Sequence, residues 1–301
     1  MALNTTMRAV VYSGTPYNMS VMNVPKPTII NETDVVLRIT TSAICGSDLH
    51  MYHGISEVGD GVSSLSVGDY VVCNMDSYGE GGKLGGFQAE FTRVSFADAS
   101  LIPVPLTAET INSSIEMDYL TLTDIFPTAW SDLHAPRDRA ASIGAIPVNF
   151  AKSDPVSHIL SLEPEGVTRA IDCVGIEAVN RNGTIQENLI LEQMINVVSK
   201  QGGIGQVGLY VTQGSSPGAP LGDTLSLNIS FPITRFFEKN LRYQAGFVDP
   251  KTLAPQLVKV IAAGQASPSF IKTAVIAIED VSRYYQRFDD HEEIKVYIQF
   301  P

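Results

Sequence analysis

The sequence predicts a two-part fold of class α/β plus β, in which a compact β-barrel-like part is followed by a part built around a mainly parallel sheet. The first third of the chain contains short β-branched runs separated by Gly, Pro and Asn. From about Leu120, short apolar runs alternate with segments of helical periodicity. The length of 301 residues, with 44% apolar side chains, is enough for two domains with buried cores.

The β-rich part is expected from four apolar runs that are bounded by turn-forming residues. Glycines are frequent between these runs, as in turns and barrel corners, and helical periodicity is scarce. A compact β-barrel-like domain is therefore expected. The predicted strands are Arg8 to Tyr12, Asp34 to Thr41, Val67 to Cys73 and Gly86 to Val94.

The second part is expected to contain βαβ units, because its apolar strands alternate with amphipathic helices. The predicted strands are Ile146 to Phe150, Ala170 to Val174 and Ile204 to Tyr210, and the predicted helices are Asp154 to Leu162, Ile185 to Val198 and Thr252 to Ala262. The chain end becomes β-like again at Ala274 to Ile278 and Ile294 to Phe300. A short helix lies between these two strands, with Asp280 as its expected N-cap.

Charge and cysteine content restrict the partners and the compartment. Twenty basic residues against 32 acidic ones give a net charge of −12, which excludes nucleic acid and anionic membrane surfaces. The three widely spaced cysteines, Cys45, Cys73 and Cys173, indicate reduced thiols. No secretory signal pattern and no apolar run long enough for a membrane helix is present, so a cytoplasmic protein is expected.

The segment from Cys45 to Gly54, with the sequence CGSDLHMYHG, resembles the catalytic-zinc segment of the zinc-dependent medium-chain alcohol dehydrogenases. The resemblance is strongest to the branch of glutathione-independent formaldehyde dehydrogenases. It implies a GroES-like β-barrel catalytic domain over 1–127 and 270–301 and a truncated Rossmann-like domain over 128–269. Further matching blocks follow in family order, at Glu57 to Val62, Val67 to Val72, Gly85 to Phe91, Thr121 to Thr128, Ile143 to Pro147 and Ile171 to Gly175.

The metal sites of that family are incomplete here. The resemblance implies Cys45 and Asp124 as zinc ligands, but the Gly-His-Glu block that supplies the third ligand is absent. Zinc at low occupancy therefore requires His50 or His53 as a substitute. The alternative is that Cys45 is a small buried thiol and His50 a packing residue. The four-cysteine lobe of the structural zinc is reduced to Cys73.

This sequence also has no counterpart of the family's dinucleotide-binding site. No apolar strand with a Gly-rich turn lies between Pro127 and Ile146, so we expect no NAD cofactor. The literal G-x-G-x-x-G at Gly203 to Gly208 follows a helix and enters a strand, which is the reverse of the order that phosphate binding requires. The missing strands leave Ile146 to Phe150 either to pair with Ala170 to Val174 or to become irregular.

Three functions follow from these observations. The main expectation is a cofactor-independent, non-redox enzyme of secondary metabolism that isomerises, cyclises or eliminates a small apolar molecule, with Ser47, Asp48, His50 and Asp124 as catalytic residues. For Asp48 the alternative is a salt bridge that holds the loop, and for Asp124 it is a helix N-cap ahead of Ile125. The second function is a non-catalytic binding or regulatory protein, with a homodimer left open. The third is a zinc- and NAD-dependent alcohol or aldehyde dehydrogenase.

Overall fold

The computed structural model of the chain forms two compact units, each with its own hydrophobic core. Unit 1 comprises Met1–Ser131, Ser216–Leu221 and Asp249–Pro301, and unit 2 comprises Asp132–Ser215 and Gly222–Val248. The residues that the structure describes are 5–53, 71–73, 87–94, 97, 101–123, 144–210, 212, 214–217, 220–226, 228–246 and 250–301.

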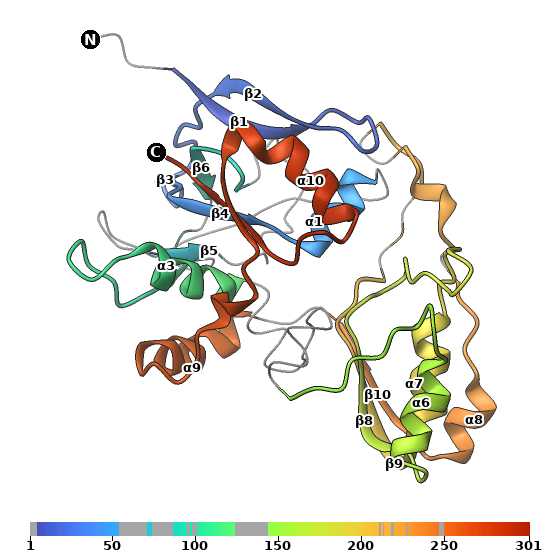
Figure 1. The fold of residues 1–301 in the computed structure, drawn as a ribbon. Helices are drawn as coiled ribbons and strands as arrows, with labels where there is room; N and C mark the ends of the chain where they lie inside the picture. Colours follow the sequence, from blue (N-terminus) through green and yellow to red (C-terminus); the bar gives the residue numbers. More distant parts are fainter. Residues whose placement is uncertain are drawn as a thin grey trace. The chain divides into compact units, whose positions relative to one another are not determined.

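Unit 1 contains short paired strands, as the first third of the sequence predicts (Figure 1). The antiparallel pairs are β1 (Thr6–Tyr12) with β2 (Met19–Pro25), β3 (Val35–Arg38) with β6 (Phe91–Val94), and β5 (Val71–Cys73) with β7 (Leu101–Pro103). The predicted strand at Arg8 to Tyr12 is confirmed. The expected run from Asp34 to Thr41 is interrupted, and a separate strand, β4 (Thr41–Ile44), begins at its end.

The chain end returns to unit 1 and completes its largest core. Strand β12 (Val296–Gln299) lies between β4 and β11 (Ala274–Ala277), antiparallel to β4 and parallel to β11. Helix α10 (Val281–Asp289) connects β11 to β12 and turns its buried face inward. Ile44, Tyr285 and Ile298 meet in this core, so the C-terminal segment fixes the strand that precedes Cys45.

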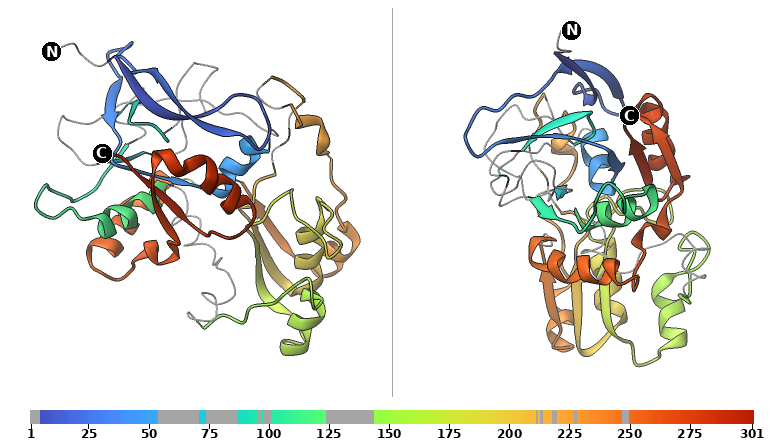
Figure 2. Two further views of the ribbon diagram at one scale, coloured as in Figure 1. Left: turned by 45° about the horizontal axis from the view of Figure 1, so that its top comes forward. Right: turned by 90° about the vertical axis from the view of Figure 1, so that its left-hand side faces the viewer.

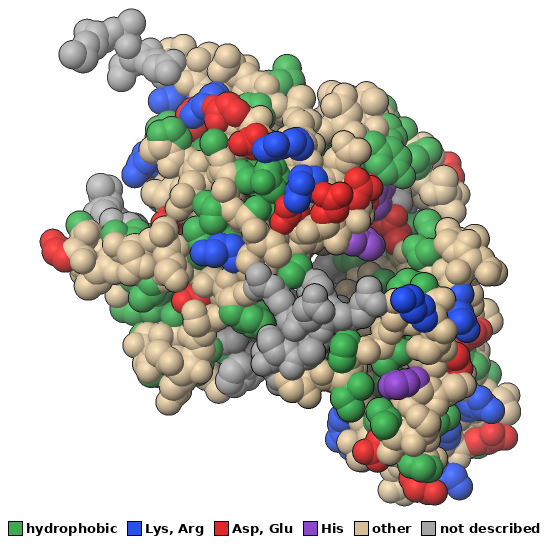
Figure 3. Space-filling view, viewed as in Figure 1, with side chains coloured by type: hydrophobic (Ala, Val, Ile, Leu, Met, Phe, Trp, Pro, Cys, Tyr) green, Lys and Arg blue, Asp and Glu red, His purple; other side chains and the backbone are tan. Residues whose placement is uncertain are grey.

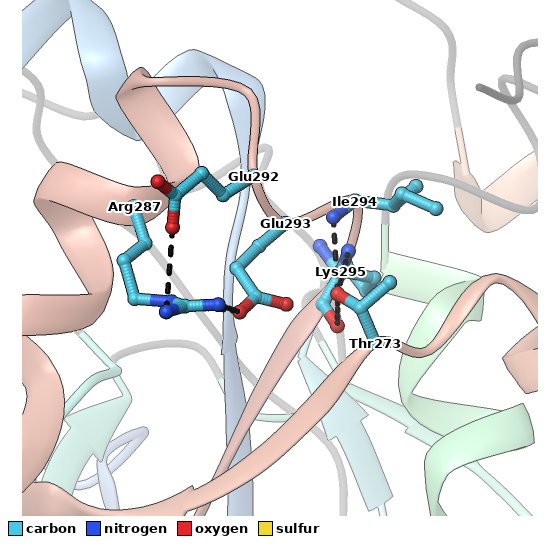
Figure 4. Close-up of polar contacts among 6 residues, drawn as sticks. All are labelled: Thr273, Arg287, Glu292, Glu293, Ile294 and Lys295. Atoms are coloured by element: carbon cyan, nitrogen blue, oxygen red, sulfur yellow. Dashed lines mark hydrogen bonds and ion pairs between the residues drawn. The ribbon is translucent and has the colours of Figure 1, made fainter.

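Charged side chains fix both ends of α10. Asp280 occupies the N-cap position, but the predicted cap hydrogen bond is absent, because the Asp280 carboxylate pairs with Arg283 at 2.9 Å. In the last turn of the helix, the Arg287 guanidinium donates to Oε1 of Glu293, a residue beyond the helix, at 2.9 and 2.6 Å (Figure 4). Figure 3 shows basic and acidic side chains side by side over this helix.

Two further helices form a second core in unit 1. Helix α3 (Ser113–Leu120) and helix α9 (Pro250–Ala262) meet through Tyr119 and the fully buried Leu257. The predicted domain bounds place α9 in the second domain, whereas the contacts place it in unit 1. The reason is that the apolar stripe of α9 packs on the α3 side of that core.

Unit 2 is a small α/β unit, as the alternating pattern predicts. Strands β10 (Arg242–Ala245), β9 (Val198–Gln206) and β8 (Val167–Asp172) form a parallel sheet in that order. Helices α6 (Pro155–Leu162) and α7 (Leu189–Val197) lie together on one side of it (Figures 1 and 2). No helix within the described ranges is both long and apolar enough to cross a bilayer.

The predicted strand at Ile146 to Phe150 is wrong. This segment has no regular structure, and Ile146 is 67% exposed. Within the described residues, β8 has a strand partner on one side only, so the expected pairing of 146–150 with this strand does not form. Irregular structure was the second of the two expected outcomes for this segment. It results because a single segment without a neighbouring strand has no partner for its backbone hydrogen bonds.

Candidate functional site

The best-defined group of predicted site residues surrounds Cys45, where β4 runs into helix α1 (Gly46–Tyr52). The Cys45 backbone N–H donates to Asp48 Oδ2 at 2.8 Å, and the Asp48 N–H donates to the Cys45 carbonyl at 3.2 Å. This reciprocal pair closes the first turn of the helix. Cys45 is half-buried and is not in a disulfide.

A chain of hydrogen bonds ties this turn to the core of unit 1. The Gln88 side-chain amide donates to Asp48 Oδ2 at 3.0 Å and to the Ala43 carbonyl at 3.1 Å. The hydroxyl of Tyr285, a residue only 1% exposed, donates to Gln88 Oε1 at 3.0 Å. Burial, and then the negative charge of Asp48, raises the pKa of Tyr285 well above its ordinary value. Tyr285 is therefore a neutral donor, and Asp48 positions the Cys45 turn.

Lys295 is a buried cation near this turn that the sequence analysis did not single out. The residue is 5% exposed, and its ammonium donates to the Ile44 carbonyl at 2.9 Å, next to Cys45. Its backbone carbonyl accepts from the Thr273 N–H at 3.0 Å, which fixes its position between β11 and β12 (Figure 4). The one signal in the sequence is a lysine between the apolar residues Ile294 and Val296.

His53, one of the two expected substitute zinc ligands, follows the end of α1 and is held by an acidic partner. Its Nε2 lies 2.7 Å from Asp289 Oδ1, at the end of α10. Its ring also lies 5.4 Å from that of Tyr17 and 6.0 Å from that of Tyr52. The ring is thus fixed by a carboxylate at hydrogen-bond distance and by two aromatic neighbours.

The predicted site residues are only partly brought together. Cys45 and Asp48 lie in one turn, whereas the side chains of Ser47 and His50 and the whole of Asp124 lie outside the described residues. Among the residues that the structure does describe, no group of three His, Cys, Asp or Glu side chains is arranged to hold a metal ion. The catalytic and ligand roles of these five residues stay predictions.

In unit 2 the literal G-x-G-x-x-G is a strand feature, as the sequence order predicts. Gly203 and Gly205 lie inside β9. The strand is followed by a tight connection in which the Val207 and Gly208 N–H groups both donate to the Asp172 carbonyl, at 2.9 and 2.8 Å. Among the described residues that follow the motif, 209–210 do not begin a helix, so Gly203 to Gly208 do not fit a pyrophosphate site.

The carboxyl ends of β8 and β9 carry a buried polar group, at the edge where α/β sheets bind ligands. Asp172 Oδ1 accepts from the Val174 and Gly175 N–H groups at 2.7 and 3.0 Å. Burial, followed by the charge of Asp172, raises the pKa of Tyr210 and of Tyr243. Both phenols therefore stay protonated beside the carboxylate at neutral pH.

A pocket of about 560 Å³ lies at the opposite, amino end of this sheet. Its half-buried lysine, Lys239, already donates to the carbonyls of Ile195, Asn196 and Val198 at 2.8, 2.8 and 2.7 Å. The lysine thereby caps the end of α7. Three acceptors therefore already engage the Lys239 ammonium.

Replacing Asp48 tests whether it positions the Cys45 turn. In Asp48→Ala, the Cys45 N–H loses its acceptor and the Gln88 amide loses one of its two, so we expect a loss of about 1 to 2 kcal/mol in unfolding free energy. The alkylation rate of Cys45, followed by peptide mass spectrometry, should rise. Asp48→Asn keeps one acceptor oxygen and should lose less on both measures. Wild-type values for Asp48→Ala would contradict the positioning role.

Comparison with known proteins identifies relatives over nearly the whole chain. No family model matches it. Zinc-type alcohol dehydrogenase B of Aspergillus flavus is 26% identical, with 98% of this chain and 82% of that relative covered. Glutathione-independent formaldehyde dehydrogenase of Bacillus subtilis is also 26% identical, with 88% and 87% covered. The first alignment spans 364 positions, 63 more than this chain has residues, so at least that many positions are unmatched.

Solved structures show the same fold. Alcohol dehydrogenase TADH from Thermus sp. ATN1 superposes with a TM-score of 0.71 at 22% identity, covering 97% of this chain and 99% of that one. The alcohol dehydrogenase of Aeropyrum pernix gives 0.69 at 18% identity, with 98% and 100% covered. The predicted combination of a GroES-like part and a Rossmann-like part is confirmed, as is the resemblance to the zinc-type enzymes.

Proposed function

Because its relatives and structural neighbours are zinc-type medium-chain alcohol dehydrogenases, we propose that this chain is an alcohol dehydrogenase-like oxidoreductase for small alcohols or aldehydes. The observation that carries the proposal is the extent of the similarity, which runs through 98% of the chain rather than through one unit. The relatives' names favour this function over the non-redox enzyme that the sequence alone favours.

In unit 1, a zinc-dependent dehydrogenase function depends on Cys45 as a metal ligand. The resemblance implies Cys45 and Asp124 as zinc ligands, and of these two only the Cys45 side chain lies in the described ranges. Zinc bound there would act as a Lewis acid on an alcohol or carbonyl oxygen. Asp48 and Gln88 supply the rigid support that a ligand residue needs, because Asp48 accepts from the Cys45 backbone N–H at 2.8 Å and Gln88 donates to that same Asp48 oxygen at 3.0 Å.

The glycine motif at Gly203 to Gly208 does not fit a dinucleotide-binding site, so we assign no hydride-transfer step to these residues. Gly203 and Gly205 lie within β9 rather than at a strand-to-helix turn. This disagreement favours a second candidate, the cofactor-independent non-redox reaction on a small apolar molecule. Enclosing and orienting one substrate can lower the barrier of such a reaction by several kcal/mol.

Zinc content and dinucleotide binding separate the two candidates. For the dehydrogenase we expect about one zinc ion per chain and saturable binding of NAD or NADP, with oxidation of small alcohols. Cys45→Ser should lose the zinc, whereas Cys173→Ser, the same substitution in unit 2, should keep it. A chain without zinc and without dinucleotide binding would overturn the dehydrogenase and support the non-redox candidate.

A further inference from the structure

The sheet of unit 2 has two faces that differ in what covers them. Ala170 and Ile204 lie in one core cluster with Met194 and Ile195 of α7, so they mark the covered face. Successive side chains of a strand point to opposite faces, which places the residues between them on the other side. Those residues are Arg169 and Ile171 of β8 and Gly203 and Gly205 of β9.

The strand register extends this second face across β10. Arg242 pairs with Gly203, which pairs with Arg169, and Gln244 pairs with Gly205, which pairs with Ile171. We refer to these six residues as the open face. Within the described residues, α6 and α7 lie on the covered side only (Figure 1). Parallel sheets are ordinarily covered on both faces, so the open face is unusual.

The open face is flat and partly apolar along its centre. Gly203 and Gly205 give the middle strand no side chains there, and Ile171 is 39% exposed. A Cβ atom built on Gly203 would lie 3.1 Å from Arg169 Cδ, so the Arg169 side chain lies across the middle strand. Glycine in a strand interior often marks a place where another backbone approaches closely.

The open face is also positively charged in an acidic chain. Arg169 and Arg242 are exposed and flank Gly203 in one row. Their Cα atoms are two strand spacings apart, about 10 Å. In the described part of the chain neither forms an ion pair, and the Arg169 guanidinium donates only to the Thr168 carbonyl, at 2.8 Å.

We propose that the open face docks an acidic amphipathic helix of a partner protein. The diameter of a helix with its side chains, about 10 Å, matches the separation of the two arginines. The apolar stripe of such a helix would lie on Ile171, Gly205 and the Arg169 methylenes that cover Gly203, and its carboxylates would meet the guanidinium groups of Arg169 and Arg242. A second copy of the same face would oppose four arginines, so charge complementarity favours a different, acidic partner.

A synthetic helix tests the proposal with the full chain. The probe is an 18-residue peptide with an Ala and Leu stripe flanked by Glu, followed by fluorescence anisotropy. We expect saturable binding that weakens with salt, and a decrease of about tenfold or more in the Arg169→Glu, Arg242→Glu double variant. Arg181→Glu, an exposed charge reversal outside the sheet, should bind like wild type. The same peptide with Lys for Glu should not bind.

Three results would overturn the proposal. The first is equal peptide binding by the double variant and the wild type, with both shown to be folded by circular dichroism. The second is a wild-type dimer in sedimentation that the double variant converts to a monomer, which would make a second copy the occupant. The third is competition by inorganic phosphate that removes all peptide binding at constant ionic strength, which would identify a small-anion site.

Discussion

Gly175→Ala is expected to prevent unit 2 from folding stably. Gly175 has φ +87°, and a Cβ atom there would lie 2.5 Å from the Leu209 carbonyl oxygen and 2.6 Å from the Leu209 nitrogen. Both are backbone atoms of the segment that follows β9, so neither can move aside like the end of a side chain. Adding the cost of a left-handed alanine to that of overpacking gives a loss of about 3 kcal/mol or more in unfolding free energy.

Gly183→Ala is the matched control for this prediction. Gly183 has φ +76°, but nothing lies within 4 Å of its Cβ position, so only the conformational cost of about 1 kcal/mol applies. Urea unfolding followed by circular dichroism, with proteolysis at sites in unit 2, measures both variants. Equal losses in the two variants would show that the contact between Gly175 and Leu209 is unimportant.

Local sequence patterns were sufficient to predict those helices and strands whose own residues determine both their conformation and the face that is buried. Helix α6 occupies the predicted range from Asp154 to Leu162, and the Asp154 side chain caps it by accepting from the Ser157 N–H at 3.1 Å. Strand β1 and helix α7 follow their apolar periodicity closely. In each case propensity, capping or periodicity agrees with the tertiary packing, so a short window contains the necessary information.

Other elements depend on partners that a short window does not contain. All four residues of β10 are exposed, and it is a strand because its backbone pairs with β9. Ile146 to Phe150 has strand-like residues and no strand neighbour in the described sheet, so it is irregular. Hydrogen bonding between distant segments, rather than side-chain pattern, decides both outcomes.

The same distinction applies to the candidate site. The residue types of the Cys45 turn indicated a site, and the resemblance supplied their expected roles. The support came from Gln88 and Tyr285, which are 40 and 197 residues away from their respective hydrogen-bond partners Asp48 and Gln88. No spacing rule connects such residues, so the hydrogen-bond partners through which Asp48 holds the loop are visible only in the folded chain.

Asp34→Ala is expected to cause the second large loss of stability, this time in unit 1. Asp34 Oδ2 accepts from the Ile30 and Asn31 N–H groups, both at 2.9 Å, and from the Arg93 guanidinium at 2.7 Å. The carboxylate is fully buried and the Arg93 side chain is 12% exposed. Removing the carboxylate leaves a buried cation unpaired, so a loss of about 3 to 5 kcal/mol in unfolding free energy is expected. In Asp34→Ala with Arg93→Met, stability should partly recover, because neither charge remains.

The pH dependence of this loss separates the ion pair from simple packing. Burial acts to raise the pKa of Asp34, but the Asn31 and Ile30 N–H groups and then Arg93 lower it to below its ordinary value. A carboxyl group whose pKa is lower in the folded state stabilises the fold above its unfolded pKa of about 3.9, and this stability is lost as the pH falls through the folded pKa. The difference in unfolding free energy between wild type and Asp34→Asn should therefore be constant from pH 7 to about pH 5 and shrink below about pH 4. If this difference in unfolding free energy were the same at pH 7 and at pH 2, Asp34 would act by shape and hydrogen bonding alone. The ion pair with Arg93 would then contribute nothing to the stability.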